Sequence, residues 1–261
     1  MRDTASDPQV ARPHFVSRRV ALAGRSAEAL LVGVVGAWLG WLVGGLVHSA
    51  VGMTMAVVAG MNGVLSGWRG IYSWRTSHGV AAFVLDSTWA TFPVGVGLIA
   101  HVAARVSKDG GGFKRSLSIR QDRHVYCGGA HLQPGFALTL GNVISSAGDT
   151  SRVRRRKLIT DHEAVHVWQA RWFGPAYLVL YLGWTAMGAL GGVLLWLRRG
   201  RREQLGHMVE SCSYYLNPFE WWAYSRDDLW PPPGLAQGVG WRKPVVRPLA
   251  DIRAHRTVDA E

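Results

Sequence analysis

Five consecutive residues, His162-Glu163-Ala164-Val165-His166, have the HExxH spacing that is typical of a catalytic zinc site. On a helix, residues four positions apart lie on one face, so the imidazoles of His162 and His166 can reach a single ion. Glu163 directly follows the first histidine, where its carboxylate can hold and deprotonate a metal-bound water. The alternative is a helix that displays two solvated histidines. We favour a divalent-metal site, with zinc (Zn2+) as the expected ion and Glu163 as the general base.

A hydrolytic zinc site needs a third protein ligand and an open position for water. The best candidate for this ligand is Glu220. Asn217 is a good helix cap and Pro218 suits the first helical position, so a helix is expected to begin there with Glu220 in its first turn. The alternative is a capping box, in which the Glu220 carboxylate only accepts from the Asn217 amide. Glu210 and His207 are the remaining candidates for the third ligand.

Two further polar residues, Tyr224 and Asp227, share the helix face of Glu220. We expect Asp227 to orient a ligand imidazole by a hydrogen bond from outside the ligand shell. Tyr224 is expected to be catalytic, its hydroxyl stabilising the anionic intermediate of a hydrolysis.

The composition favours a membrane protein. Charged residues make up only 18% of the 261 residues, and aromatic residues 10%, although a mean hydropathy of +0.07 indicates that much of the chain is polar. The net charge of +12 suits nucleic acid or anionic lipid, and we favour lipid because Lys and Arg flank apolar stretches. Cys127 and Cys212 lie far apart without a CxxC pair, which argues against a disulfide framework or a cysteine zinc site.

Residues 29–67 contain no Asp, Glu, Lys or Arg, which predicts a transmembrane helical hairpin that turns near His48. Gly36, Gly40 and Gly44 recur every four residues, a spacing that lets two membrane helices approach backbone to backbone. These glycines are therefore candidate contacts with a second copy of the chain or with a partner membrane helix. The alternative is the glycine-rich apolar core of a soluble protein.

Residues 68–107 are expected to lie at the membrane interface or to re-enter the membrane. Asp86, Pro93 and His101 interrupt an apolar stretch here, so a broken span and a buried soluble helix stay open as alternatives. Asp86 is a candidate intramembrane carboxylate or, equally, a helix cap.

The remaining folded part, residues 108–230, is predicted to be mostly helical with a small β-sheet, which makes the fold class α+β. The HExxH helix should begin near Thr160 and end at Gly174. Short strands are expected between Gly and Pro residues at 116–119, 124–127 and 136–145.

The segments TLGNVI, DHEAVHVWQ, FGPAY and NPFEWWAY resemble a group of small bacterial HExxH proteins. HEAVH with a later Glu-x-x-Ala is similar to the gluzincin-type zinc metallopeptidases, especially the integral-membrane ones related to CaaX-processing and heat-shock endopeptidases. The likeness covers residues 126–228 and implies a metallopeptidase-like domain. Membrane gluzincins usually carry Asp directly after Glu-x-x-Ala, where this chain has Tyr224. The resemblance implies that the metal ligands are His162, His166 and Glu220. It also implies that the general base is Glu163.

The apolar stretch 177–197 sets a topological condition on the proposed site. If it crossed the bilayer once, HExxH and Glu220 would lie on opposite sides, because nothing between them is apolar enough to cross back. Basic clusters on both sides of the stretch also favour the cytoplasmic side. We therefore expect it to enter and return, with a bend near Gly183 or Gly188, or to be buried against protein.

These features predict a membrane-bound zinc peptidase of the bacterial plasma membrane, with its catalytic domain facing the cytoplasm and a peptide or protein as substrate. The rival class is a non-enzymatic membrane scaffold or assembly protein with a vestigial or structural HExxH, and a channel-like role is a third alternative. Residues 1–28 are expected to be a basic cytoplasmic tail without a removable signal peptide. Residues 231–261 are expected to be an extended or disordered tail rich in Pro and charge.

Overall fold

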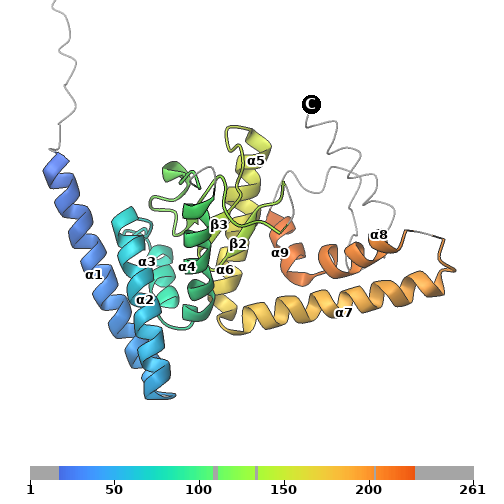
Figure 1. Ribbon diagram of the computed structural model, residues 1–261, viewed down its shortest axis with the longest axis horizontal. Helices are drawn as coiled ribbons and strands as arrows, with labels where there is room; N and C mark the ends of the chain where they lie inside the picture. The colour runs from blue at the N-terminus through green and yellow to red at the C-terminus, as the bar shows by residue number, and fades with distance from the viewer. Residues whose placement is uncertain (1–17, 108–110, 133–134, 203, 227–261) are drawn as a thin grey trace, which may run out of the picture.

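The protein is mostly helical around one small sheet, which agrees with the predicted α+β class (Figure 1). Of the two predicted tails, 231–261 lies outside the described part, and so does the first tail apart from residues 18–28, which are helical. The computed structural model describes residues 18–107, 111–132, 135–202 and 204–226.

Helices α1 (Arg18–Gly45) and α2 (Ser49–Arg69) form the hairpin that the uncharged stretch predicted. His48 caps α2, its Nδ1 accepting a hydrogen bond from the Ala50 amide at 3.2 Å. Both helices are long and apolar enough to cross a membrane.

Gly36, Gly40 and Gly44 face α2. A Cβ added at Gly40 would come within 2.7 Å of the Met55 carbonyl oxygen, and one at Gly44 within 2.8 Å of the Gly52 Cα. Only a residue without a side chain allows this approach of the two backbones. The glycines therefore pack within the chain, and a contact of the hairpin with a second copy or a partner helix stays a prediction.

Helices α3 (Ser77–Ser87) and α4 (Thr91–Val106) reach the length of a membrane span only together, and they are bent by 89° at the break between them. This is the geometry of a broken span or a re-entrant loop. Asp86 lies in the last turn of α3, and the cap position of α4 is Ala90. The alternative in which Asp86 caps a helix is therefore wrong, because α3 continues through it.

The sheet has three short strands, β1 (His124–Val125), β2 (Leu138–Leu140) and β3 (Val143–Ser145), in the order β1-β3-β2. β1 runs parallel to β3, and β2 pairs antiparallel with β3, so β2 lies at an edge. The buried residues that join this sheet to the HExxH helix are Val125, Ile144, Ala147, Ile159 and Val167.

The strand predicted at residues 116–119 is wrong, because the chain forms a 3-10 turn, η1 (Arg115–Leu117), at this place. The Ser118 hydroxyl donates to the Lys114 carbonyl at 2.8 Å and accepts from the Val125 amide at 2.9 Å. Such local bonds between a serine and the backbone compete with strand pairing.

HExxH lies on one helical segment that starts before the predicted residue. It consists of α5 (Val153–Lys157), a π-helical turn η2 (Leu158–His162) and α6 (Glu163–Phe173). Gly174 ends it as predicted, with φ +50° and no room for a side chain, since an added Cβ would lie 2.6 Å from Nε1 of Trp89.

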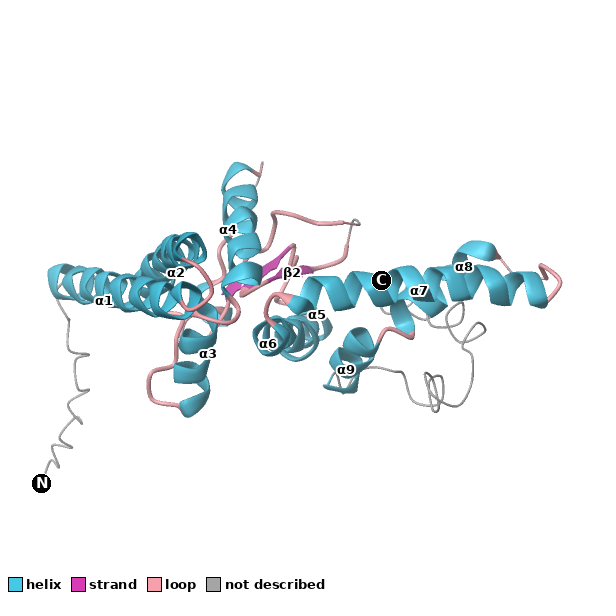
Figure 2. Ribbon diagram, turned by 90° about the horizontal axis from the view of Figure 1, so that it is seen from below, coloured by secondary structure: helices cyan, strands magenta, loops and turns pink. Residues whose placement is uncertain are grey.

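Helix α7 (Ala176–Arg198) is one unbroken helix that lies crosswise to the hairpin (Figures 1 and 2). The bend predicted near Gly183 or Gly188 is therefore wrong. The chain turns back after α7 instead, and α8 (Leu205–Glu210) and the π-helical turn η3 (Ser211–Tyr215) run back along it.

Two glycines of α7 let the returning chain lie close. A Cβ added at Gly188 would meet the Cys212 carbonyl oxygen at 2.3 Å, and one at Gly192 the Met208 carbonyl oxygen at 2.9 Å. The return ends in α9 (Pro218–Arg226), which packs against α6. The topological condition is thus met by a helix and an antiparallel return rather than by a bent helix.

A buried ion pair fixes α6 against the rest of the molecule. The Arg171 guanidinium donates to both carboxylate oxygens of Asp86, from Nε at 2.8 Å and from Nη2 at 2.9 Å. The same carboxylate accepts from the Tyr72 hydroxyl at 3.0 Å and from the Asn142 amide at 3.2 Å. The HExxH helix is therefore tied to α3 and the sheet by charge as well as by apolar packing.

Candidate metal centre

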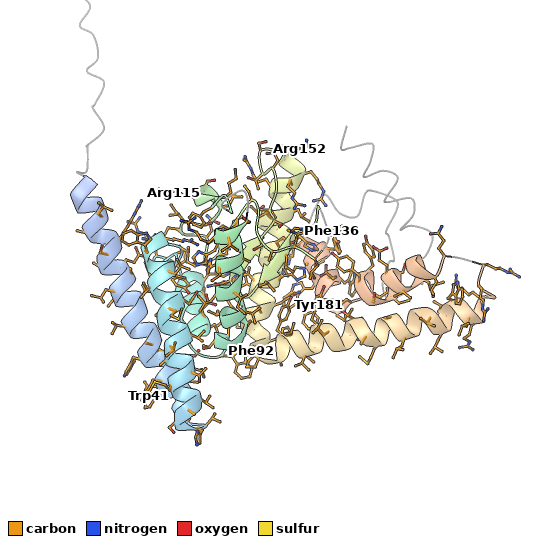
Figure 3. The ribbon with its side chains drawn as sticks, viewed as in Figure 1. Trp41, Phe92, Arg115, Phe136, Arg152 and Tyr181 are labelled. Atoms are coloured by element: carbon orange, nitrogen blue, oxygen red, sulfur yellow. The ribbon has the colours of Figure 1, made fainter. Side chains whose placement is uncertain are left out.

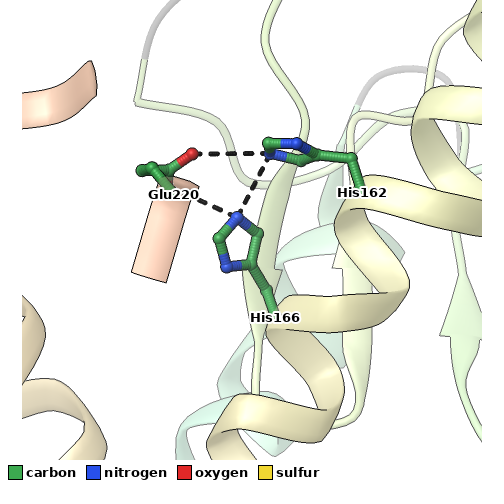
Figure 4. A group of neighbouring side chains, drawn as sticks. All are labelled: His162, His166 and Glu220. Atoms are coloured by element: carbon green, nitrogen blue, oxygen red, sulfur yellow. Dashed lines mark hydrogen bonds and ion pairs between the residues drawn. The ribbon is translucent and has the colours of Figure 1, made fainter. Parts of the chain in front are cut away.

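His162, His166 and Glu220 converge in a buried triangle (Figure 4). The two Nε2 atoms lie 3.2 Å apart, and each is 3.4 Å from a different carboxylate oxygen of Glu220. Two donors held about 2.0–2.1 Å from a tetrahedral zinc lie roughly 3.4 Å apart. The three residues therefore have the spacing of ligands to one ion and could hold a metal.

The local structure of both helices explains this convergence. His162 is the last residue of the π-turn η2 and His166 lies one turn further along α6, so both rings point to the same side. In the other helix, Asn217 Oδ1 accepts from the Phe219 amide at 3.1 Å, as expected of a cap. The Asn217 amide donates to the Tyr214 carbonyl instead of to Glu220. The capping box is thus not formed, and the Glu220 carboxylate faces the histidines.

Electrostatics favour a cation inside the triangle. Burial raises the pKa of the Glu220 carboxyl, but the neighbouring His166 and His162 lower it by more. The net pKa is below its ordinary value, so the carboxylate is ionised. Burial lowers the pKa of His166, while the Glu220 charge raises it to about 9. Among the described residues, Glu220 Oε2 and His162 Nδ1 are buried without a hydrogen-bond partner. A buried anionic oxygen that has no hydrogen bond besides its ion pair with His162 at 3.4 Å is what a bound metal ion would satisfy.

Gln169 sets the orientation of one ligand, a role that the sequence analysis did not assign. His166 Nδ1 lies 2.8 Å from Gln169 Oε1, and the Gln169 amide nitrogen donates to the Phe219 carbonyl at 2.8 Å. Because an amide oxygen can only accept, Nδ1 carries a proton, and a metal ion in the triangle would be bound through Nε2 in place of the second proton. The position of Gln169, three residues after His166, was the sequence signal that could have indicated this role.

The carboxylate ligand has its own donor from α7. The Tyr181 hydroxyl donates to Glu220 Oε1 at 2.7 Å, and the Tyr177 hydroxyl lies 3.4 Å from His166 Nδ1. Figure 3 shows Tyr181 on the side of α7 that faces α9. Nothing in the local sequence separates these tyrosines from other residues of an apolar helix, so sequence analysis did not find them.

Glu163, the expected base, begins α6 beside the triangle and is buried. Its Oε2 accepts from the Thr139 hydroxyl at 2.6 Å. Thr139 is the middle residue of the edge strand β2, so the sheet holds this carboxylate in place. Thr139 was not identified from the sequence, because the contact depends on how the strand packs on α6.

The ring of Tyr224 lies beside the centre. Its ring packs on that of His162, with centroids 4.3 Å apart, and its hydroxyl lies 3.1 Å from the Tyr214 hydroxyl. A role of this hydroxyl toward an anionic intermediate stays a prediction. Glu210, at the end of α8, is not in the triangle. Asp227 and the side chain of His207 lie outside the described part.

The chain shows no match to models of protein families, to curated proteins or to solved structures. The resemblance to gluzincin metallopeptidases therefore stays a prediction.

Proposed function

We propose that this protein is a membrane-associated zinc peptidase. The observation that carries the proposal is the buried triangle of two imidazoles and one carboxylate at 3.2–3.4 Å spacings, with a further carboxylate, Glu163, directly beside it. Two histidines and a glutamate are a ligand set of hydrolytic zinc sites and leave a position for water.

In the proposed reaction the chain's own residues position and move protons. Bound zinc would supply acidity to a coordinated water and polarise the substrate carbonyl. Glu163 accepts the proton of the attacking water and returns it to the leaving amine. Thr139 holds one oxygen of this carboxylate, so that the other can take the proton. Gln169 and Tyr181 hold His166 and Glu220 in position.

The edge of the sheet offers a place for an extended peptide. Within the described part of the chain, β2 pairs with β3 along one side alone, and its residues are half-buried. A peptide could add to the other side of β2 by main-chain hydrogen bonds. Because Thr139 of this strand contacts Glu163, a peptide bound there would run past the proposed base.

The helices support a membrane location. Among the described helices, α1, α2 and α7 are long and apolar enough to cross a membrane. Because α7 lies crosswise to the hairpin, a hairpin that crosses the bilayer makes α7 run parallel to the membrane plane. The antiparallel return keeps HExxH and Glu220 on one side. We assign this side to the cytoplasm of a bacterial plasma membrane, since Arg residues cluster there.

The test measures both the zinc content and the peptidase activity of the purified full-length protein in detergent or nanodiscs. We expect about one zinc per chain and cleavage of a fluorogenic peptide library. Glu163→Gln should retain zinc and lose hydrolysis, whereas Glu220→Ala should lose both. His131→Ala removes an exposed histidine outside the triangle and should change neither.

A protein without metal, or a Glu163→Gln variant with full activity, would overturn the peptidase proposal. The hairpin would then favour the alternative of a membrane scaffold.

A further inference from the structure

A groove with a volume of about 820 Å³ lies between α2 and α4, away from the metal triangle. Its wall is almost wholly apolar and includes the indole of Trp68 and the imidazole of His101. A volume in this range suits one drug-sized or lipid-sized ligand. Its lining includes Gly60, Val64 and Trp68 of α2 and His101 of α4.

His101, which lines this groove, has a buried ring nitrogen without a hydrogen-bond partner. The Tyr126 hydroxyl accepts a hydrogen bond from Arg69. Its own proton is therefore donated to His101 Nδ1, at 2.7 Å. The proton of a neutral His101 ring is therefore on Nε2. Within the described residues, Nε2 is buried and has no hydrogen-bond partner, and the whole residue is only 8% exposed. A buried N–H without an acceptor is costly, which points to a ligand oxygen at this place.

One end of the groove is basic. α2 and α4 run side by side in the same direction, because Gly95 lies against Val58 while His101 lies against Arg69 further along. Arg69 and the exposed Arg105 are therefore at the same end as His101. Neither arginine has a carboxylate partner among the residues that the structure describes. Trp68 lines the same end, as is typical of a membrane interface.

We propose that this groove binds one anionic phospholipid. Its acyl chain lies along the apolar wall toward Gly60, an ester carbonyl oxygen accepts from His101 Nε2, and the headgroup phosphate lies near Arg69 and Arg105. A transmembrane helix is a poorer occupant, because its carbonyl groups are already bonded within the helix and offer no acceptor to His101. This site goes beyond the proposed peptidase function and does not require it.

The test uses the full-length protein in nanodiscs that contain phosphatidylglycerol with a photoreactive diazirine in its acyl chain. Light should attach the lipid to α2 and α4 at the groove residues, as mapped by peptide mass spectrometry. It should attach less to Leu190 and Leu194, which are equally open to lipid on α7. Unlabelled phosphatidylglycerol should compete roughly fivefold better than phosphatidylcholine, since the basic end adds charge attraction.

Two matched variants locate the site. Val64→Trp fills the groove and should abolish most of the labelling. Val57→Trp, on the same helix and equally exposed (53% against 51%) but outside the groove, should not. His101→Phe should lower labelling several-fold, and His101→Gln, which keeps a donor, should restore part of it.

Even labelling of all exposed helices would overturn the proposal. So would equal effects of the two tryptophan variants, or no preference for the anionic lipid. These readouts are measured without any hydrolysis, so a failure of the peptidase proposal leaves them unaffected.

Discussion

Arg171 and Asp86 form a buried, two-pronged ion pair that joins the HExxH helix to α3. Arg171 lies five residues after the ligand His166, so the position of this pair also fixes where the metal triangle stands relative to the hairpin. The pair therefore couples α3, which packs on the hairpin, to the proposed metal centre.

Asp86→Asn should destabilise the protein strongly. The substitution leaves the Arg171 guanidinium buried without its counter-charge, which costs about 3–5 kcal/mol in comparable cases. Chemical denaturation of the purified protein measures the change in the free energy of unfolding. Asp149→Asn is the control, because it breaks an exposed pair with Arg152 and should leave the free energy of unfolding almost unchanged. A similar small loss for both variants would contradict the proposed role of the buried pair.

Gln169→Leu should weaken metal binding while the fold is retained. Without the Gln169 oxygen, His166 no longer has its proton fixed on Nδ1, and loss of such a partner typically lowers metal affinity about 10–100-fold. Competition with a fluorescent zinc chelator measures the affinity. Gln121→Leu, at an exposed position outside the triangle, should bind zinc as the unchanged protein does. Equal affinity of both variants would show that Gln169 does not orient the ligand.

Thr139→Val should lower turnover without removing the metal. Loss of a hydrogen bond to a charged group costs about 1.5–3 kcal/mol, which corresponds to a decrease in kcat of about 10–100-fold if Glu163 is the base. Zinc content should stay the same, and Thr139→Ser, which keeps the hydroxyl, should retain most of the rate. An unchanged kcat in the Thr139→Val variant would show that this hydroxyl does not contribute to the reaction.

Acid should destabilise the protein through His124. Burial, followed by the nearby His101 and Arg69, lowers the pKa of His124 well below 6.5. In acid, His124 therefore binds a proton in the unfolded chain but not in the folded chain. As a result, the free energy of unfolding decreases as pH falls below about 6.5. One such proton contributes about 1.4 kcal/mol per pH unit.

Urea denaturation between pH 7 and pH 5 measures this dependence. His124→Asn should make it less steep by about that amount per pH unit, and His131→Asn, at an exposed position, should leave it unchanged. An identical slope for the His124 variant and the unchanged protein would mean that other groups cause the acid sensitivity.

Features that depend on helix periodicity could be predicted from the sequence. A spacing of four residues places His162 with His166, and Gly40 with Gly44, on one face of a helix whatever the rest of the chain does. Asn217 and Pro218 likewise fixed the start of α9, from which Glu220 reaches the histidines.

Features that depend on packing between distant segments could not be predicted. The bend expected in α7 was wrong because the topological condition can also be met by an antiparallel return, which requires contacts such as that of Gly188 with Cys212. Thr139 and Tyr181 have no local signal, since each becomes relevant only through a partner on another element.

His166 and Glu220 are far apart along the sequence although they are close in space. This separation has a consequence for the synthesis of the protein. The ribosome releases HExxH first and α9 last, after the whole of α7 and its return. A nascent chain that ends before α9 contains two imidazoles but no third ligand. The ligand set is therefore complete only after α9 has been made, so the proposed metal site cannot act on the chain during most of its synthesis.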